Sequence, residues 1–357
     1  MDVTLNKRIV WVDVLKGVTV LLVAMHHALL SFTALYGSST HILFTLIDKA
    51  NYILGFARIP AFFLAAGLVM ASIKGSKSRW FLTKRLPLML WVIILWTSIS
   101  LVFEMIGFHL YPWSNYPSFP NGYNFPVPFG NLWFVYALLI LSAYAALISK
   151  LPTPLQIVLT LFLSFAIHLL LKLYHFDTEI SNMLFYNLAY QGLPFFTAGF
   201  LFKDFIVKVF NRPKKVLVVM TMCFLFMFVF KNNVVDTAGY SVLLFKYIPM
   251  TLIFVGLIAY TSKIRLIEEF FFNVGCNSLE FFILHQFFIA LFFHIYNSEY
   301  FGYVPELLIS ITAPIVVCFI FIITFKSFIK PLFVLPKFVS YLGRKVVLAL
   351  CGKESRM

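Results

Sequence analysis

The sequence predicts an all-α integral membrane protein with about ten transmembrane helices and both termini in the cytoplasm. Hydrophobic residues make up 61% of the chain and charged residues only 12%, with a mean hydropathy of +0.92. Water-soluble domains are typically about 45–50% apolar and about 25% charged. The apolar residues occur in repeated runs of roughly 16 to 23, the length that a membrane-spanning helix needs, without the alternation of a β-barrel strand.

Short basic loops separate the apolar runs and set the orientation. Most of the 28 Lys and Arg residues fall in the termini and in every second loop. Cytoplasmic loops of membrane proteins carry an excess of Lys and Arg. This rule accounts for the net charge of +14, so the charge does not indicate nucleic-acid binding. The predicted spans lie near residues 10–32, 51–73, 86–108, 131–149, 154–172, 186–203, 216–231, 242–261, 273–295 and 306–325.

The chain is expected to form one multi-pass membrane domain over residues 1–330, followed by a basic cytoplasmic tail at 331–357. The first apolar run follows Lys7 and Arg8 and is too long for the core of a cleaved signal peptide, so it should remain as a signal anchor. The segment 109–130 is rich in Pro and aromatic residues, which predicts an ordered interfacial loop on the outer side.

The first span carries four ionisable residues, three of which share one face. At about 100° per residue, Lys16 and His27 are three turns plus about 20° apart, and Asp13 lies within about 60° of both. His26 lies about 80° from Lys16, which favours His27 as the functional histidine. Ionisable groups inside a bilayer are costly and are functional candidates by default. The alternative is structural: Asp13 and Lys16 pair or snorkel at the cytoplasmic edge, and the histidines bond to neighbouring helices.

Arg58 lies in the second predicted span, at a position in the middle to outer half of the membrane. Pro60 is expected to open the helix nearby and free a backbone carbonyl. Arg58 could then meet His27, or it could snorkel outward. The basic loop after this span ends in Lys84 and Arg85, which can bind phosphate as well as mark the cytoplasmic side.

The ninth predicted span carries a second polar stripe. Ser278 and His285 are seven residues apart, which places them about 20° from alignment on one face. Glu280 lies on another face and is expected either to pair with a basic group or to lie near the cytoplasmic edge. Hydrogen bonding between helices is the simplest role for Ser278. The four cysteines have no CxxC spacing, so the sequence indicates no metal site.

In their order along the chain, these segments resemble the membrane-bound acyltransferase-3 family, which includes O-acetyltransferases of bacterial surface glycans. Asp13-Val-Leu-Lys-Gly17 followed by His27 resembles the opening motif of the family. Four later pieces also match it: Arg58-Ile-Pro-Ala-Phe-Phe-Leu-Ala-Ala-Gly67, Phe81-Leu-Thr-Lys-Arg85, Asn131-Leu-Trp-Phe134, and Gly275-Cys-Asn-Ser278 with the later His285.

The resemblance extends over about residues 8–330 and departs from the family pattern at two positions. Ala66 stands where Ser is common, and Lys16 stands where Arg is commoner, so a bidentate contact is not available there. The resemblance implies transfer of an acetyl group from acetyl-CoA, or of another acyl group from its CoA ester, to a sugar hydroxyl of a surface polysaccharide or lipid-linked precursor. The acyl-CoA would be a donor substrate, with no tightly bound cofactor.

Such a transfer needs a base for the hydroxyl proton and a positive group near the developing oxyanion. His27 is the candidate base or covalent acyl carrier, and His285 is a second candidate. Asp13, a further catalytic candidate on the same stripe, is about 21 Å from His27 along a straight helix and cannot touch it. Arg58 would steady charge or the acceptor. The candidates for binding CoA phosphates are Lys16, Lys84 and Arg85, and the further polar candidates are Ser278, Glu280 and His26.

Two other functions are compatible with the same residues. A transporter of a lipid-linked sugar or small solute would use the His and Arg residues as substrate or proton sites. A non-catalytic scaffold of a glycan-assembly complex would need them for stability alone. The expected partners are an acyl-CoA, a glycan acceptor and membrane lipids, in the bacterial inner (cytoplasmic) membrane, with no nucleic acid. The sequence predicts no oligomeric state.

Overall fold

The computed structural model describes residues 9–73, 76–105, 132–173, 184–230, 242–296 and 302–336. Every regular element in these segments is helical, which confirms the all-α prediction. Six helical segments are long and apolar enough to cross a membrane, and a seventh is added if one sharply bent pair counts as a single span. The protein is therefore an all-α membrane protein.

A helix occurs at each of the ten predicted spans. The first five positions hold α1 (Val10–Tyr36), α2 (Ile42–Ala71), α4 (Leu86–Met105), α5 (Trp133–Ile148) and α6 (Thr153–Leu173). The other five hold α8 (Leu193–Leu201), α10 (Pro213–Val229), α12 (Ile248–Thr261), α14 (Ser278–Ile295) and α15 (Tyr303–Thr324). Several of these helices are shorter than a full crossing, so the number of crossings stays a prediction.

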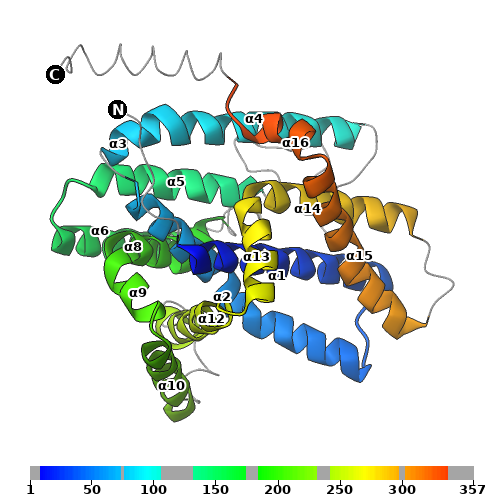
Figure 1. Ribbon diagram of the computed structural model, residues 1–357, viewed down its shortest axis with the longest axis horizontal. Coiled ribbons are helices and arrows are strands. Elements are labelled where there is room, and N and C mark those ends of the chain that lie inside the picture. Colours follow the sequence, from blue (N-terminus) through cyan, green and yellow to red (C-terminus); the bar gives the residue numbers. More distant parts are fainter. Residues whose placement is uncertain are drawn as a thin grey trace.

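Short helices connect the long ones, and one of them changes a predicted boundary. They are α3 (Lys77–Trp80), α9 (Lys203–Phe210), α13 (Arg265–Cys276) and α16 (Lys326–Phe333). The ninth span was predicted to begin at residue 273, but the helix breaks at Asn277 and α14 begins at Ser278. The preceding α13 is bent by 118° from the segment Phe245–Thr261, and Figure 1 shows it crossing α1 near the middle of the molecule.

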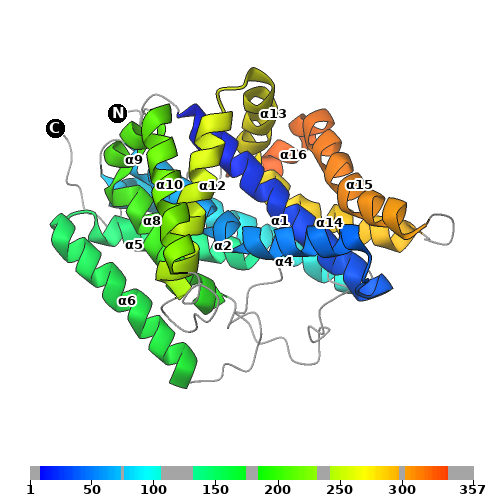
Figure 2. The same ribbon diagram turned by 90° about the horizontal axis from the view of Figure 1, so that it is seen from below.

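The chain ends and the predicted outer loop lie largely outside the described residues. These parts are residues 1–8, the tail from residue 337 onward, and the loop from 106 to 131. The predicted domain boundary at residue 330 falls inside α16, whose Ile329 and Phe333 are buried. Figures 1 and 2 both place α6 and α15 at opposite edges of the bundle.

A pair of glycines brings α1 and α13 into direct backbone contact. A Cβ atom at Gly17 would lie 2.0 Å from the carbonyl oxygen of Phe271, and a Cβ atom at Gly275 would lie 1.8 Å from the carbonyl oxygen of Asp13. Any larger residue would overlap the opposing backbone. Small residues at a crossing let membrane helices approach closely and gain van der Waals contact, which drives association where the hydrophobic effect is absent.

A second glycine pair joins α2 and α8 in the same way. A Cβ atom at Gly67 would lie 2.0 Å from the carbonyl oxygen of Phe196, and one at Gly199 would lie 2.3 Å from that of Leu64. The main hydrophobic core forms around these two crossings and includes buried side chains from α1, α2, α5, α8 and α14. Backbone contact therefore holds α1, which carries His27, against α13, and α2, which carries Arg58, against α8.

Three helical segments contain a five-residue π-helical turn that ends two residues before a proline. The turns are η1 (Phe81–Arg85), η3 (Leu188–Gly192) and η4 (Leu243–Tyr247), and the prolines are Pro87, Pro194 and Pro249. Proline has no amide hydrogen, and its ring collides with the carbonyl four residues earlier in an α-helix. Widening that turn relieves the collision, and such turns are frequent at functional sites.

Pro60 acts differently, because α2 continues through it as an α-helix. A proline at this position cannot bond to the carbonyl of Phe56, four residues earlier. The Thr251 hydroxyl of α12 donates to that carbonyl at 3.4 Å. The predicted free carbonyl therefore exists, and a neighbouring helix supplies its partner, as expected where no water is present.

Replacing Gly275 with alanine is expected to lower the free energy of unfolding by about 1–3 kcal/mol, because the added methyl group overlaps the Asp13 carbonyl. Gly302→Ala is the matched control, since no atom lies within 4 Å of a Cβ built there. Thermal unfolding of the purified protein in detergent measures both variants. Equal stability of the two would contradict the close crossing of α1 and α13.

Candidate active site

The two histidines singled out on separate spans stack against each other. The ring centroids of His27 in α1 and His285 in α14 are 5.5 Å apart, and the ring planes differ by 29°. His285 is 1% exposed. The His26 ring also lies beside His27, with centroids 5.4 Å apart. Three imidazole rings are thus clustered inside the bundle.

The tautomer of neutral His285 follows from its hydrogen bond. Its Nδ1 atom lies 3.1 Å from the Phe281 carbonyl oxygen, which can only accept. Nδ1 therefore carries the proton, and Nε2 holds a lone pair. Within the described parts of the chain, the buried Nε2 has no hydrogen-bond partner. A buried basic nitrogen without a partner is suited to accepting a proton from a substrate hydroxyl.

Arg58 is joined to the histidine cluster through Asn51, a residue that the sequence analysis did not single out. The Arg58 guanidinium donates from Nη1 to Asn51 Oδ1 at 2.7 Å, and Asn51 Nδ2 donates to His26 Nδ1 at 3.1 Å. Arg58 also lies within electrostatic reach of His27, the partner predicted for it. Asn51 precedes Arg58 by seven residues, and this same-face spacing was the signal available in the sequence.

Asp13 and Lys16 form an ion pair near the start of α1. Lys16 Nζ lies 2.6 Å from Asp13 Oδ1, and Asp13 is 5% exposed. This geometry matches the structural alternative for these residues. The pair is about three turns of helix from His27, so Asp13 belongs to a different part of the molecule from the histidine cluster.

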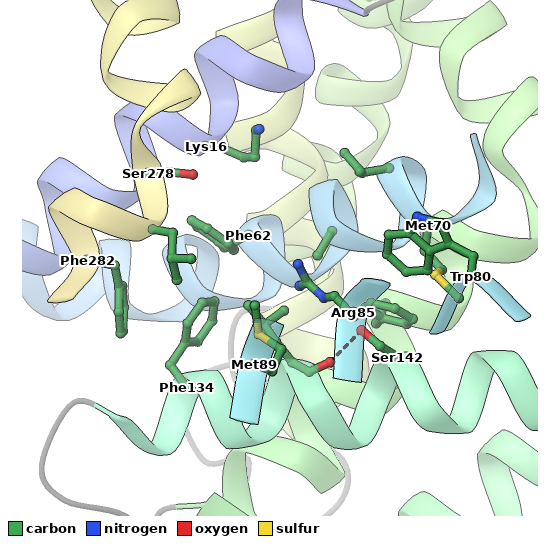
Figure 3. Close-up of a pocket in the computed structure, with 15 residues that line it drawn as sticks. Lys16, Phe62, Met70, Trp80, Arg85, Met89, Phe134, Ser142, Ser278 and Phe282 are labelled. Carbon is green, nitrogen blue, oxygen red and sulfur yellow. Dashed lines mark hydrogen bonds between the residues drawn. The ribbon is translucent and has the colours of Figure 1, made fainter. Parts of the chain in front are cut away.

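A pocket of about 180 Å³ collects three of the polar residues singled out in the sequence. Lys16 of α1, Arg85 of η1 and Ser278 of α14 all line it (Figure 3). Ala66, at the position where the family pattern has Ser, also lines the pocket, so no hydroxyl is present there. Most of the remaining lining is apolar.

The π-helical turn η1 holds two of the three basic residues predicted to bind phosphate, Lys84 and Arg85. Arg85 extends into the pocket in Figure 3, and its buried Nε has no hydrogen-bond partner among the described residues. Lys84 is exposed and is not part of the pocket lining. An enclosed guanidinium with an unused donor favours an anionic or carbonyl oxygen ligand.

Glu280 lies in the first turn of α14, outside the pocket lining. Its half-buried carboxylate is within electrostatic reach of Lys16, Lys326 and Lys330. The pairing of Glu280 with a basic group stays a prediction. Lys326 and Lys330 belong to the short helix α16, which packs against α14.

The sequence of residues 9–324 matches the family model described as an acyltransferase domain, of the acyltransferase-3 type. The chain belongs to the membrane acyltransferase-3 family. The match covers all the candidate residues on α1, α2, η1 and α14, so the pocket and the histidine cluster lie within the acyltransferase domain. Comparison with curated proteins and with solved structures gives no significant match.

Replacing Asn51 with leucine is expected to destabilise the protein by about 1–3 kcal/mol, because the buried Arg58 guanidinium loses its acceptor. The loss should be smaller when Arg58→Met is already present, which a double-mutant cycle of thermal unfolding would measure. Asn273→Leu, at an exposed position, provides the control. Strictly additive effects at Asn51 and Arg58 would contradict the link between them.

Proposed function

We propose that this acyltransferase moves an acetyl group from acetyl-CoA to a sugar hydroxyl of a surface polysaccharide or lipid-linked glycan precursor, in the bacterial cytoplasmic membrane. The observation that carries the proposal is the pocket holding Arg85 and Lys16, which reaches the phenylalanine that packs against His285. A pocket whose two cations suit an anionic donor therefore lies one aromatic ring away from a buried basic nitrogen.

The reaction requires the sugar hydroxyl oxygen to attack the thioester carbonyl carbon. The imidazole pair takes the hydroxyl proton, and the carbonyl oxygen becomes an oxyanion that a nearby positive group stabilises. Collapse breaks the carbon–sulfur bond, completes the ester, and returns the proton to the departing CoA thiolate. General base catalysis of this kind contributes about 10²–10⁴-fold.

His27 keeps the role of base or covalent acyl carrier. His285 is a second candidate base, because its hydrogen bond to Phe281 leaves a lone pair on Nε2. In the direct route, either imidazole takes the proton while the acyl group passes straight to the acceptor. In the covalent route, His27 first receives the acyl group and then gives it to the sugar. Both routes use the stacked pair as one unit, since each ring lies against the other.

Acetyl-CoA is too large to fit inside the pocket as a whole, so only one end of the molecule would enter it. Ligand sites for drug-sized molecules are about 300–1,000 Å³, and this pocket is about 180 Å³. The thioester end of acetyl-CoA would enter, with Arg85 and Lys16 close to its polar groups. The nucleotide end would stay outside, where Lys84 is exposed.

The acceptor is assigned to the opposite side of the histidine cluster. Asn51 and Arg58 lie there, next to His26. By the predicted orientation this is the outer half of the membrane. The acetyl group would therefore travel along α1, from the level of Lys16 to the level of His27, to reach a sugar acceptor from the other side.

Loss of either histidine is expected to remove one acetyl group from the surface glycan. The measurement is mass spectrometry of glycans from cells with the intact protein, without it, or with folded and normally expressed His27→Ala or His285→Ala variants. His294→Ala is the matched control, because His294 is exposed on the same helix as His285. Unchanged acylation in the deletion strain would contradict the glycan assignment and would favour the transporter.

Arg85→Ala is expected to raise the KM for acetyl-CoA by about 10–150-fold, because a hydrogen bond to a charged group is worth about 1.5–3 kcal/mol. Lys84→Ala should change the KM by less than about fivefold, since exposed ion pairs contribute about 0–1 kcal/mol. Steady-state kinetics with varied acetyl-CoA concentrations measure both. An equal effect of the two substitutions would contradict the assignment of Arg85, rather than Lys84, to the binding of the donor.

A further inference from the structure

Three phenylalanine rings close one end of the pocket. They are Phe62 of α2, Phe134 of α5 and Phe282 of α14. The Phe134 ring centroid lies 4.8 Å from that of Phe62 and 4.5 Å from that of Phe282. All three side chains are buried. Figure 3 shows these rings at one end of the pocket, away from Met70 and Trp80. We call them the phenylalanine wall.

The histidine cluster lies behind this wall. The Phe282 ring meets the His285 ring edge to face, with centroids 5.8 Å apart. His285 in turn stacks on His27. One aromatic ring therefore separates the pocket from the imidazole that has an available lone pair. A group bound against the wall would lie next to the site of the proposed chemistry.

The polar groups of the pocket come from residues other than the wall, namely Lys16, Arg85, Ser142 and Ser278, and Figure 3 shows Ser278 on the same side as Phe62 and Phe282. Lys16 and Arg85 are the charged residues among the described lining residues, and the Ser142 hydroxyl is already bonded to the Leu138 carbonyl at 2.6 Å (Figure 3). The wall presents hydrocarbon alone. A CoA thioester bound here would keep its polar groups near the two cations and direct its acyl chain toward the rings.

We propose that the phenylalanine wall is an acyl-binding subsite that accepts an acetyl group and excludes longer chains. This inference rests on the proposed acyl-CoA-dependent function and adds its chain-length specificity. The pocket of about 180 Å³ must also hold the thiol end of the CoA arm, so a chain that lengthens toward the wall would meet the three rings. Apolar pockets discriminate ligands that differ by one methylene group by about 10–200-fold.

Phe282 is the ring to test, because it is both part of the wall and in contact with His285. Phe282→Ala opens the pocket toward the histidines. Phe288→Ala is the matched control: it removes a buried ring from the same helix, packed against Phe321 at 5.0 Å and outside the pocket lining. Both substitutions leave a cavity, but Phe282→Ala alone enlarges the pocket.

Unreactive CoA thioethers with S-ethyl and S-hexyl chains provide the probes, and isothermal titration calorimetry of the full-length protein in detergent provides the dissociation constants. The native protein and Phe288→Ala should bind S-ethyl-CoA at least about tenfold more tightly than S-hexyl-CoA. In Phe282→Ala, the ratio of the S-hexyl-CoA to the S-ethyl-CoA dissociation constant should fall by at least about tenfold, because the longer chain then fits.

A folded Phe282→Ala protein that binds S-ethyl-CoA normally and keeps the native ratio would overturn the subsite. If this variant does not fold, Phe282→Leu should shift the ratio in the same direction by a smaller factor, and an unchanged ratio there would also overturn it. Failure of the native protein to bind either thioether would overturn the acyl-CoA proposal together with this inference. Binding with an unaltered ratio overturns the inference alone.

Discussion

The glycine crossing between α1 and α13 is the contact on which the candidate site depends. Gly17 and Gly275 let the two backbones touch. Because α14 begins three residues after Gly275, this crossing also positions α14 beside α1. His27 and His285 each lie ten residues beyond their glycine. The helix breaks at Asn277 between Gly275 and His285, and the packing of α14 against α1 brings the two rings into stacking contact.

A bilayer offers no partners to buried polar groups, so the protein must supply them. Asp13 neutralises Lys16, and Asn51 connects Arg58 to the imidazoles. The candidate-site atoms His285 Nε2 and Arg85 Nε have no hydrogen-bond partner in the described parts of the chain. In the proposed reaction, substrate oxygens would satisfy both atoms.

Two adjacent basic residues of η1 have different surroundings. Arg85 lines the pocket and Lys84 is exposed, because neighbouring residues of a helix point in directions about 100° apart. Pro87 follows two residues after η1, and the widened turn accommodates a proline that a regular α-helix would not.

The sequence by itself determined the membrane class, the shared face of Ser278 and His285, and the carbonyl freed by Pro60. These features follow from composition and from about 100° of rotation per residue within one helix. Only the tertiary structure decided that His285 meets His27, that Asn51 joins Arg58 to His26, and that the phenylalanine wall closes the pocket. Contacts between helices depend on where the helices cross, and periodicity within a helix carries no information about the partner that packs on each face.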